Sequence, residues 1–428
     1  MSKGISINID RIIIQLLCWY ALLIPLEHIL EVLFQIETIL KPYRVLAILI
    51  IGCFVVRLRF KWTANPELGQ DIFLYIIFIY GLIVTLLRMI TSTFNLALFF
   101  NDAFQISLYL GVFVVIRHIS ITRSDLLRIT KFLAGGVLIN SSFIFYNFFT
   151  LRVYGRDPGF MDNPNYMALS ILVVILLLIV QYPSINGLLK KVLVLAMMLF
   201  LGYIFMLAGS RTALAVLVAC IIIMLCFSHM KVKVALITMS IVLISFLSFG
   251  GLGLLQESGN LALINRLQTK SASEDNRISI WRGVLKAAET TSYTGLGVGQ
   301  FKARFREFYI SENNQEISRM RERGYFISPH SDYLAFLAIY GIVGLGSYLI
   351  FLSLSLKKVF FKYQQSVDND TRQHYQFGFL ILIAVVFFGL ANENVISALF
   401  WILLAISTRV ETSETEILDE QNSLKKHE

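Results

Sequence analysis

The sequence predicts an all-α polytopic membrane protein with about 12 transmembrane helices and one large extracytoplasmic loop that contains amphipathic helices. Of its 428 residues, 57% are hydrophobic and only 15% are charged, whereas soluble domains carry about 25% charged residues. The mean hydropathy is +0.71. Apolar runs of nearly membrane-crossing length recur along the chain. Helices are the structure expected for such runs, because they satisfy their own backbone groups in lipid.

The apolar runs define the expected spans. These are Ile12–His28, Val45–Val56, Ile72–Leu87, Phe104–Ile116, Phe132–Phe149, Tyr166–Val180, Val192–Leu207, Ala213–Phe227, Val234–Leu252, Tyr333–Leu356, Phe377–Leu390 and Val395–Ser407. Residues 1–252 therefore hold the first nine helices, residues 253–332 form the large extracytoplasmic (periplasmic) loop, and residues 333–409 hold the last three helices. Residues 410–428 are a polar and acidic cytoplasmic tail that we expect to be disordered.

The distribution of Lys and Arg predicts the orientation. With the N-terminus inside, the cytoplasmic segments hold 20 of these residues and the short outer segments hold six. The remaining 11 of 37 lie in the large loop, and long loops are exempt from the positive-inside rule. The net charge of +9 is thus mostly a signal of topology, and no nucleic-acid partner is expected.

The N-terminus and the cysteines add two further expectations. The first apolar run is long and lacks a small-residue cleavage site, so it is typical of an anchor and not of a cleaved signal peptide. The cysteines lie inside the expected spans, at Cys18, Cys53, Cys220 and Cys226. Their spacing matches neither a disulfide framework nor a metal site, and no metal or other cofactor is expected.

Two outer regions interrupt the apolar pattern. The first is Leu151–Asn165, where Pro and Gly make turns and Asn or Asp can cap the next helix. This region is either a capped turn between two spans or a loop edge that hydrogen-bonds sugars. Arg156 and Asn165 are its candidate substrate-binding residues.

The large loop is the second region, and its apolar residues follow helical spacing. An amphipathic helix is expected over Arg277–Glu289 and another around Phe301–Tyr309. Between them lies Thr294–Gly299, which alternates glycine with other residues. This stretch is either a flexible turn or a place where backbone N–H groups face a phosphate. Arg282, on the first of these helices, is a further substrate-binding candidate.

Arg211 lies between two spans with almost no loop around it. An arginine at the membrane rim is often an anchor that extends its charge to the interface. The alternative is that it faces a cavity and binds an anion, because ionisable groups near membrane depth are often functional. Arginine pairs with phosphate through two parallel hydrogen bonds, which lysine cannot do as well.

His330 lies at the outer start of the tenth span, after Pro329. It is either an interfacial cap or a general base, since an imidazole that is neutral near pH 7 accepts a proton readily. Pro329 is suited to a helix start and would fix the place of His330 there. Asp332 either orients the imidazole or complements the helix dipole.

Four stretches, taken together, resemble the family of O-antigen ligases and of O-antigen and exopolysaccharide polymerases. They are Gly159–Asn165, with its Asn-Pro-Asn turn; Gly209–Thr212, with a Ser-Arg element; Arg277–Trp281 followed by Gly295–Phe301, an Arg-x-x-x-Trp and Gly-x-Gly-x-Gly-x-Phe block; and Pro329–Leu334 with Tyr340–Leu345, a His-x-x-Tyr-Leu and Tyr-Gly-x-x-Gly block. The resemblance covers about Gly159 to Leu404. Ser331 departs from the pattern, because many members have Asn after the His.

The resemblance implies a GT-C-like membrane glycosyltransferase of the bacterial inner (plasma) membrane, with its active site on the extracytoplasmic side. The donor would be a glycan on undecaprenyl diphosphate, and the family is regarded as metal-independent. Arg211 and Arg277 would bind the diphosphate, and His330 would take the proton of the acceptor. Arg156, Asn165, Arg282 and Asp332 would contribute to substrate binding. Direct displacement would invert the anomeric centre.

Three functions stay open at this point. A polymerase would use a second lipid-linked glycan as acceptor, whereas a ligase would use the lipid A core. The Asn-Pro-Asn turn and the His-x-x-Tyr-Leu form favour the polymerase, for which a chain-length regulator is a conceivable further partner besides membrane lipid. A flippase or other transporter of lipid-linked glycans is the alternative of another class. That class predicts charges deep within the spans and repeated halves, and the sequence has few of the former and no evident repeat.

Overall fold

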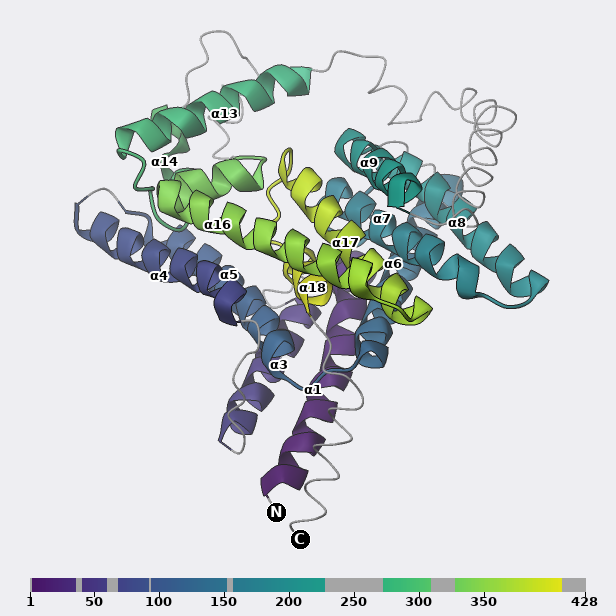
Figure 1. Cartoon of the computed structure of the whole chain (residues 1–428). Helices are drawn as coiled ribbons and strands as arrows, with labels where there is room; N and C mark the ends of the chain where they lie inside the picture. The colour runs from purple at the N-terminus through teal and green to yellow at the C-terminus, as the bar shows by residue number, and fades with distance from the viewer. Residues whose placement is uncertain are drawn as a thin grey trace.

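The computed structural model describes residues 2–35, 41–59, 68–91, 94–151, 157–227, 272–308 and 328–409. Within these ranges all regular structure is helical (Figure 1). The helices are α1 (Ser2–Leu23), η1 (Ile24–Leu26), α2 (Ile29–Phe34), α3 (Pro42–Leu58), α4 (Leu68–Thr91), α5 (Leu96–His118), α6 (Arg123–Thr150), α7 (Pro164–Gln181), η2 (Tyr182–Ser184), α8 (Leu188–Ala208), α9 (Arg211–Phe227), α13 (Ala272–Thr290), α14 (Gln300–Phe308), α16 (Asp332–Gln365), α17 (Asn369–Gly389) and α18 (Ala398–Thr408).

The chain is a multi-pass membrane protein. Among the described residues, seven helices are long and apolar enough to cross a membrane, namely α1, α4, α5, α6, α7, α8 and α16, and α9 and α18 are shorter apolar helices. Every predicted span except Val234–Leu252 falls on a helix. That span and the predicted tail 410–428 lie outside the described residues. The total of twelve spans therefore stays a prediction.

Two boundaries differ from the prediction for identifiable reasons. The first span was expected to run from Ile12 to His28, but α1 ends at Leu23 and the 3₁₀ turn η1 follows. Pro25 lies in that turn and lacks the N–H that a continuing helix needs. The fourth span was expected to begin at Phe104, but α5 begins eight residues earlier, at Leu96. Polar residues in its first turns end the apolar run early: Asn101, Asp102 and Gln105.

The predicted amphipathic helices of the large loop are confirmed as α13 and α14. The apolar residues Ile280, Val284 and Phe301 pack with Ala338 of α16 in a small cluster of their own. Burial of these apolar side chains fixes the loop helices against the membrane bundle. Helices α13 and α14 therefore have a defined place on the bundle (Figure 1).

The glycine-rich stretch 294–299 is neither a flexible turn nor a free phosphate cradle. The backbone N–H groups of Leu296 and Gly297 donate to the carbonyls of Ala338 and Ile339 in α16, at 2.8 and 3.0 Å. These carbonyls are available because α16 is interrupted at Gly341, which has φ of 64°. A Cβ atom at Gly341 would lie 2.2 Å from a backbone oxygen of the loop. The expected turn is therefore present, but it is bonded to the broken helix, and the N–H groups of Leu296 and Gly297 are used there and do not face a phosphate.

Two helices, α7 and α18, form the centre of the bundle. Every residue of α18 is buried, and so is the continuous stretch Met167–Val180 of α7. Helix α17 packs on α7, α9 and α18, while α16 packs on α4 and α17, and α1 packs on α3 and α6. This arrangement brings the ends of helices that are distant in sequence together.

The bundle has two polar ends. At the end where α7 begins, the Asp162 N–H donates to Glu27 Oε1 at 2.8 Å, and the Tyr166 hydroxyl donates to the Glu393 carbonyl. We call this the loop end, because α13 and α14 lie there, at the top of Figure 1. At the opposite end, α1 begins and Arg57 pairs with Asp10. The predicted orientation makes the loop end extracytoplasmic.

Candidate functional site at the loop end

His330 lies in a strained backbone conformation directly before α16. Its φ is 51°, in the left-handed region that side chains other than glycine rarely adopt. Helix α16 begins at Asp332, and Ser331 is its N-cap. Pro329 thus does not open the helix, and the expectation that it does was wrong, because Ser331 is the N-cap and the helix begins three residues after Pro329. Strain at a non-glycine residue is often found at functional sites.

Asp332 holds the segment between α17 and α18. Its Oδ1 accepts hydrogen bonds from the backbone N–H of Asn394 at 2.5 Å and of Val395 at 3.2 Å, and its Oδ2 accepts from the Asn394 side chain at 2.9 Å. The side chain is fully buried. These contacts tie the start of α16 to residues 392–395. In the structure the Asp332 carboxylate binds Asn394 and Val395, and its contact with a substrate stays a prediction.

Glu393 is a residue that the sequence analysis missed. Only 4% of it is exposed, and neither carboxylate oxygen has a well-formed hydrogen bond within the part of the chain that the structure describes. Burial raises the pKa of this carboxyl, although Lys302 and the nearby Ser328 hydroxyl act to lower it. A buried carboxyl without a partner is costly unless it serves a function. The signal in the sequence was the polar triplet 392–394 between two apolar spans.

The His330 imidazole shares Ser328 with this carboxyl. The Ser328 hydroxyl lies 3.5 Å from His330 Nδ1, and it also acts on Glu393. Burial lowers the pKa of His330, and the positive charge of Arg277 lowers it further. The imidazole is therefore neutral near pH 7, as a general base must be. Arg277 and His330, predicted as partners in one site, lie near enough to interact.

The place of Arg211 is set by the turn that precedes it. Gly209 ends α8 in the left-handed conformation, with φ of 63°. The Ser210 hydroxyl accepts a hydrogen bond from the backbone of Ala213 at 3.3 Å and caps α9. Arg211 is therefore the first residue of α9 and is half-buried.

Helix register places Arg211 at the depth of Asp332. Helix α9 starts at the loop end and runs antiparallel to α17, and the two meet where Cys220 Sγ lies 3.8 Å from the Leu380 carbonyl. Nine residues towards the loop end, about 13.5 Å, lead to Arg211 on α9 and to Gly389 on α17. A Cβ at Gly389 would lie 2.5 Å from Asp332 Oδ2. Arg211 thus lies at the level of the His330 region.

The remaining predicted residues lie in three different settings. Asn165 is near the start of α7, where the Asn163 side chain accepts its N–H at 2.8 Å and caps the helix. This confirms the capped turn, and sugar binding by Asn165 stays a prediction. Arg282 is exposed on α13. Arg156 lies outside the described residues.

Comparison with known protein families gives a match to part of the chain. A family model described as O-Antigen ligase matches residues 195–349. No curated protein matches the chain. The matched residues include Arg211, Arg277 and His330. The match confirms the resemblance of the chain to the O-antigen ligase and polymerase family over the part that carries these three residues.

Proposed function

We propose that the protein is an inverting membrane glycosyltransferase that polymerises O-antigen or exopolysaccharide repeat units at the outer face of the bacterial inner membrane. The donor is a glycan on undecaprenyl diphosphate, and the acceptor is a hydroxyl of a second lipid-linked glycan. The observation that carries the proposal is the half-buried His330, whose pKa is lowered, beside Arg277 at the loop end, within the segment that matches the O-antigen ligase model.

The proposed step is a direct displacement. His330 Nε2 takes the proton of the acceptor hydroxyl, and the acceptor oxygen attacks the anomeric carbon of the donor. The bond from that carbon to the diphosphate oxygen breaks, and undecaprenyl diphosphate leaves with the electron pair. Arg211 and Arg277 stabilise the negative charge that develops on the leaving group. The anomeric configuration inverts.

Glu393 and Ser328 support the charge on His330 in this proposal. When His330 Nδ1 carries its proton, it faces the Ser328 hydroxyl, and Nε2 keeps the lone pair that the reaction needs. The imidazolium formed after proton transfer is a buried cation, and the Glu393 carboxylate near Ser328 compensates it. A buried carboxyl that has only weak partners in the resting protein is suited to a charge that exists only during turnover.

A ligase that transfers the glycan to the lipid A core is the second candidate, because the matching family model is described as O-Antigen ligase. The deciding experiment incubates the purified protein with lipid-linked repeat units alone, and then with added lipid A core. A ladder of lengthened glycans with the first substrate supports the polymerase. Product that forms only when lipid A core is present would replace it by the ligase. Absence of both products would reject the transfer reaction.

The orientation needs its own test, since the donor is presented at the outer leaflet. The four native cysteines are free and are first replaced by alanine. Single cysteines are then placed at Glu289 of α13 and at Asn369 of α17, both exposed and at opposite ends of the bundle. In intact cells with a permeabilised outer membrane, we expect a membrane-impermeant thiol reagent to label only Glu289→Cys. Labelling of Asn369→Cys alone would reverse the orientation and remove the proposed site from the donor.

A further inference from the structure

A second polar cavity lies at the loop end and has a volume of about 90 Å³. It is bounded by η1, α3, α5, α7 and residues 396–399, and its polar lining includes Tyr43, Arg44, Gln105, Tyr109, Asp162 and Tyr166. A water molecule needs roughly 10–15 Å³ on this measure. The cavity thus accommodates about six waters, or a group no larger than one sugar residue.

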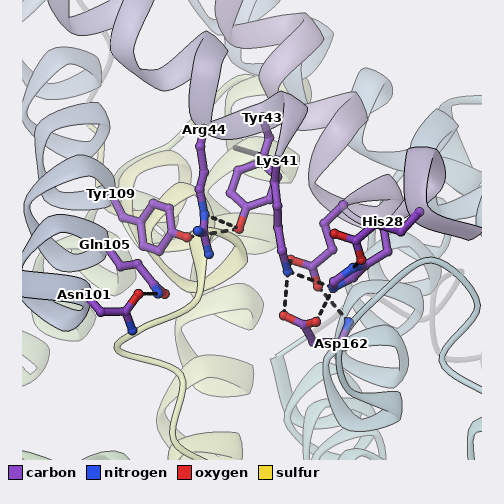
Figure 2. A network of polar contacts seen from close by, with 10 residues as sticks. His28, Lys41, Tyr43, Arg44, Asn101, Gln105, Tyr109 and Asp162 are labelled. Carbon is purple, nitrogen blue, oxygen red and sulfur yellow. Dashed lines mark hydrogen bonds and ion pairs between the residues drawn. The ribbon is translucent and has the colours of Figure 1, made fainter. Parts of the chain in front are cut away.

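One wall carries hydrogen-bond donors and aromatic rings. The hydroxyls of Tyr43 and Tyr109 lie 3.0 Å apart, and Arg44 Nε donates to the Tyr43 hydroxyl at 3.4 Å. Figure 2 shows these side chains with Gln105 on one side of the network. The guanidinium and the amide offer N–H donors, and the phenol rings offer flat apolar faces. Sugars present hydroxyl groups and C–H faces that match both.

The other wall carries the carboxylates of Glu27 and Asp162, whose negative charge is balanced by Lys41. Lys41 Nζ donates to Asp162 Oδ2 at 2.8 Å and lies 3.4 Å from Glu27 Oε2 and 2.7 Å from His28 Nε2; His28 also contacts Asp162, as Figure 2 shows. Burial acts to raise the pKa of Asp162, but Lys41 and His28 outweigh it and hold that pKa below its ordinary value. The carboxylate is therefore charged and able to accept hydrogen bonds from hydroxyl groups.

The charge pattern selects among ligand classes. Glu27, His28 and Asp162 bring metal-ligating atoms together, but the Lys41 ammonium already lies among them and provides the cation. A phosphate would face the carboxylates of Glu27 and Asp162 from the same cavity. A neutral group with many hydroxyls meets donors on one wall and acceptors on the other without an unbalanced charge.

The cavity shares a wall with the His330 site. Asp332 binds Asn394 and Val395, and the next residues, from Ile396 onward, line the cavity. Tyr166 also lines the cavity, while its hydroxyl donates to the Glu393 carbonyl. When one hydroxyl of a glycan lies at His330, a neighbouring sugar of the same glycan can therefore reach this cavity.

We propose that this cavity binds one sugar residue of the acceptor glycan and thereby contributes to the choice of acceptor. The inference rests on the proposed function and names a subsite for it. Arg211 and Arg277 come from α9 and α13, and neither helix lines the cavity. The donor diphosphate is therefore bound elsewhere, and the cavity is left to the acceptor.

The test measures sugar binding apart from transfer. The probe is the lipid-free repeat-unit oligosaccharide, released by mild acid from the lipid-linked glycan of the source cells, and its Kd is measured by saturation-transfer NMR on the detergent-solubilised protein. We expect Arg44→Ala to weaken binding about tenfold or more, since it removes a charged donor, and Gln105→Ala to weaken it by a factor of about three to ten. Ser397→Leu, which narrows the cavity, should also weaken binding, and it removes no capping hydrogen bond from α18.

Gln373→Ala is the matched control, because Gln373 lies at the opposite end and donates to Ser184 there at 2.7 Å. Its Kd should equal that of the unaltered protein. An unchanged Kd in both Gln105→Ala and Ser397→Leu would overturn the subsite. Binding that a chelator abolishes and Mg²⁺ restores would overturn it in favour of a metal site. Failure of transfer in the unaltered protein would reject the proposed function alone, since the binding measurement does not need turnover.

Discussion

The buried ion pair at the opposite end of the bundle differs from two ionisable groups at the loop end, Glu393 and His330, whose hydrogen-bond partners are weak. Arg117 donates to both oxygens of Asp71, at 2.9 and 2.8 Å, and to the Thr408 carbonyl at 2.7 Å. Neither the Arg117 nor the Asp71 side chain is exposed. Arg409 in turn donates to the Arg117 carbonyl at 2.5 Å. These bonds join α4, α5 and α18. Both carboxylate oxygens of Asp71 accept from Arg117, and neither is exposed to solvent.

At the loop end, Glu393 is buried and His330 is half-buried, and both have weak partners. The Glu393 carboxyl has no well-formed hydrogen bond among the described residues, and His330 has a contact of 3.5 Å to Ser328. Both pKa values are displaced towards the neutral form, mainly by burial. A fully paired buried charge fixes helices in place, while an under-paired one keeps its capacity for a substrate. We therefore expect pairing, more than burial, to distinguish structural from functional ionisable groups in this bundle.

The largest expected effect is on transfer by His330→Gln. Glutamine keeps a polar side chain but cannot accept a proton at neutral pH, so single-turnover transfer should fall by about 10²–10⁴-fold. Donor binding should stay near normal, because the step lost is chemical. His374→Gln, at the opposite end, is the control and should retain transfer. Near-normal turnover in His330→Gln would assign the residue to capping or positioning.

The second prediction contrasts the stability of the two ends. Arg117→Ala removes the ion pair of the buried Asp71 carboxylate and should lower the free energy of unfolding by about 3–5 kcal/mol. Glu393→Gln should change it by less than about 1 kcal/mol, because the carboxyl has little bonding to lose. Thermal melts of the detergent-solubilised variants measure both. Equal losses in the two variants would contradict the distinction between the ends.

The helices were predictable from sequence because lipid exposure imposes long apolar runs, and the predicted spans fall on helices wherever the structure describes them. The amphipathic spacing of 277–289 likewise predicted α13. The first residues of the helices were harder to predict, as at α5, where polar residues in the first turns lie at the loop end and interrupt the apolar pattern. Local pattern thus predicts which segments are helical better than where each begins.

The site was predictable only in part, since its contacts join distant residues. Arg211, Arg277 and His330 stand in recognisable motifs. Glu393 is a candidate only because its neighbour Asn394 binds Asp332, and these two residues are 62 positions apart in the sequence. The glycines of 295–299 predicted a turn correctly. No local pattern could indicate that the turn would bond to a break in α16.

The third prediction uses the pH dependence of transfer. The neutral imidazole of His330 is the active form, so kcat/KM should fall as the pH drops through the His330 pKa. That pKa lies below the ordinary value of 6.5, through burial and through Arg277. Arg277→Gln removes a positive charge that opposes protonation, so the acid limb of the profile should move to higher pH. If the acid limb did not move, the charge of Arg277 would not act on the pKa of His330.

The smallest expected effect concerns the strain at His330. With φ of 51°, alanine at this position keeps the steric conflict between Cβ and the backbone, whereas glycine removes it. His330→Gly should therefore be more stable than His330→Ala by about 1 kcal/mol, even after the greater chain entropy of glycine in the unfolded state reduces the gain. Transfer should be lost in both, because neither has an imidazole. Parallel thermal melts and transfer assays on the two variants measure the difference. If His330→Gly proved no more stable than His330→Ala, the left-handed backbone at His330 would not destabilise the protein, and no strain would be needed to place the imidazole.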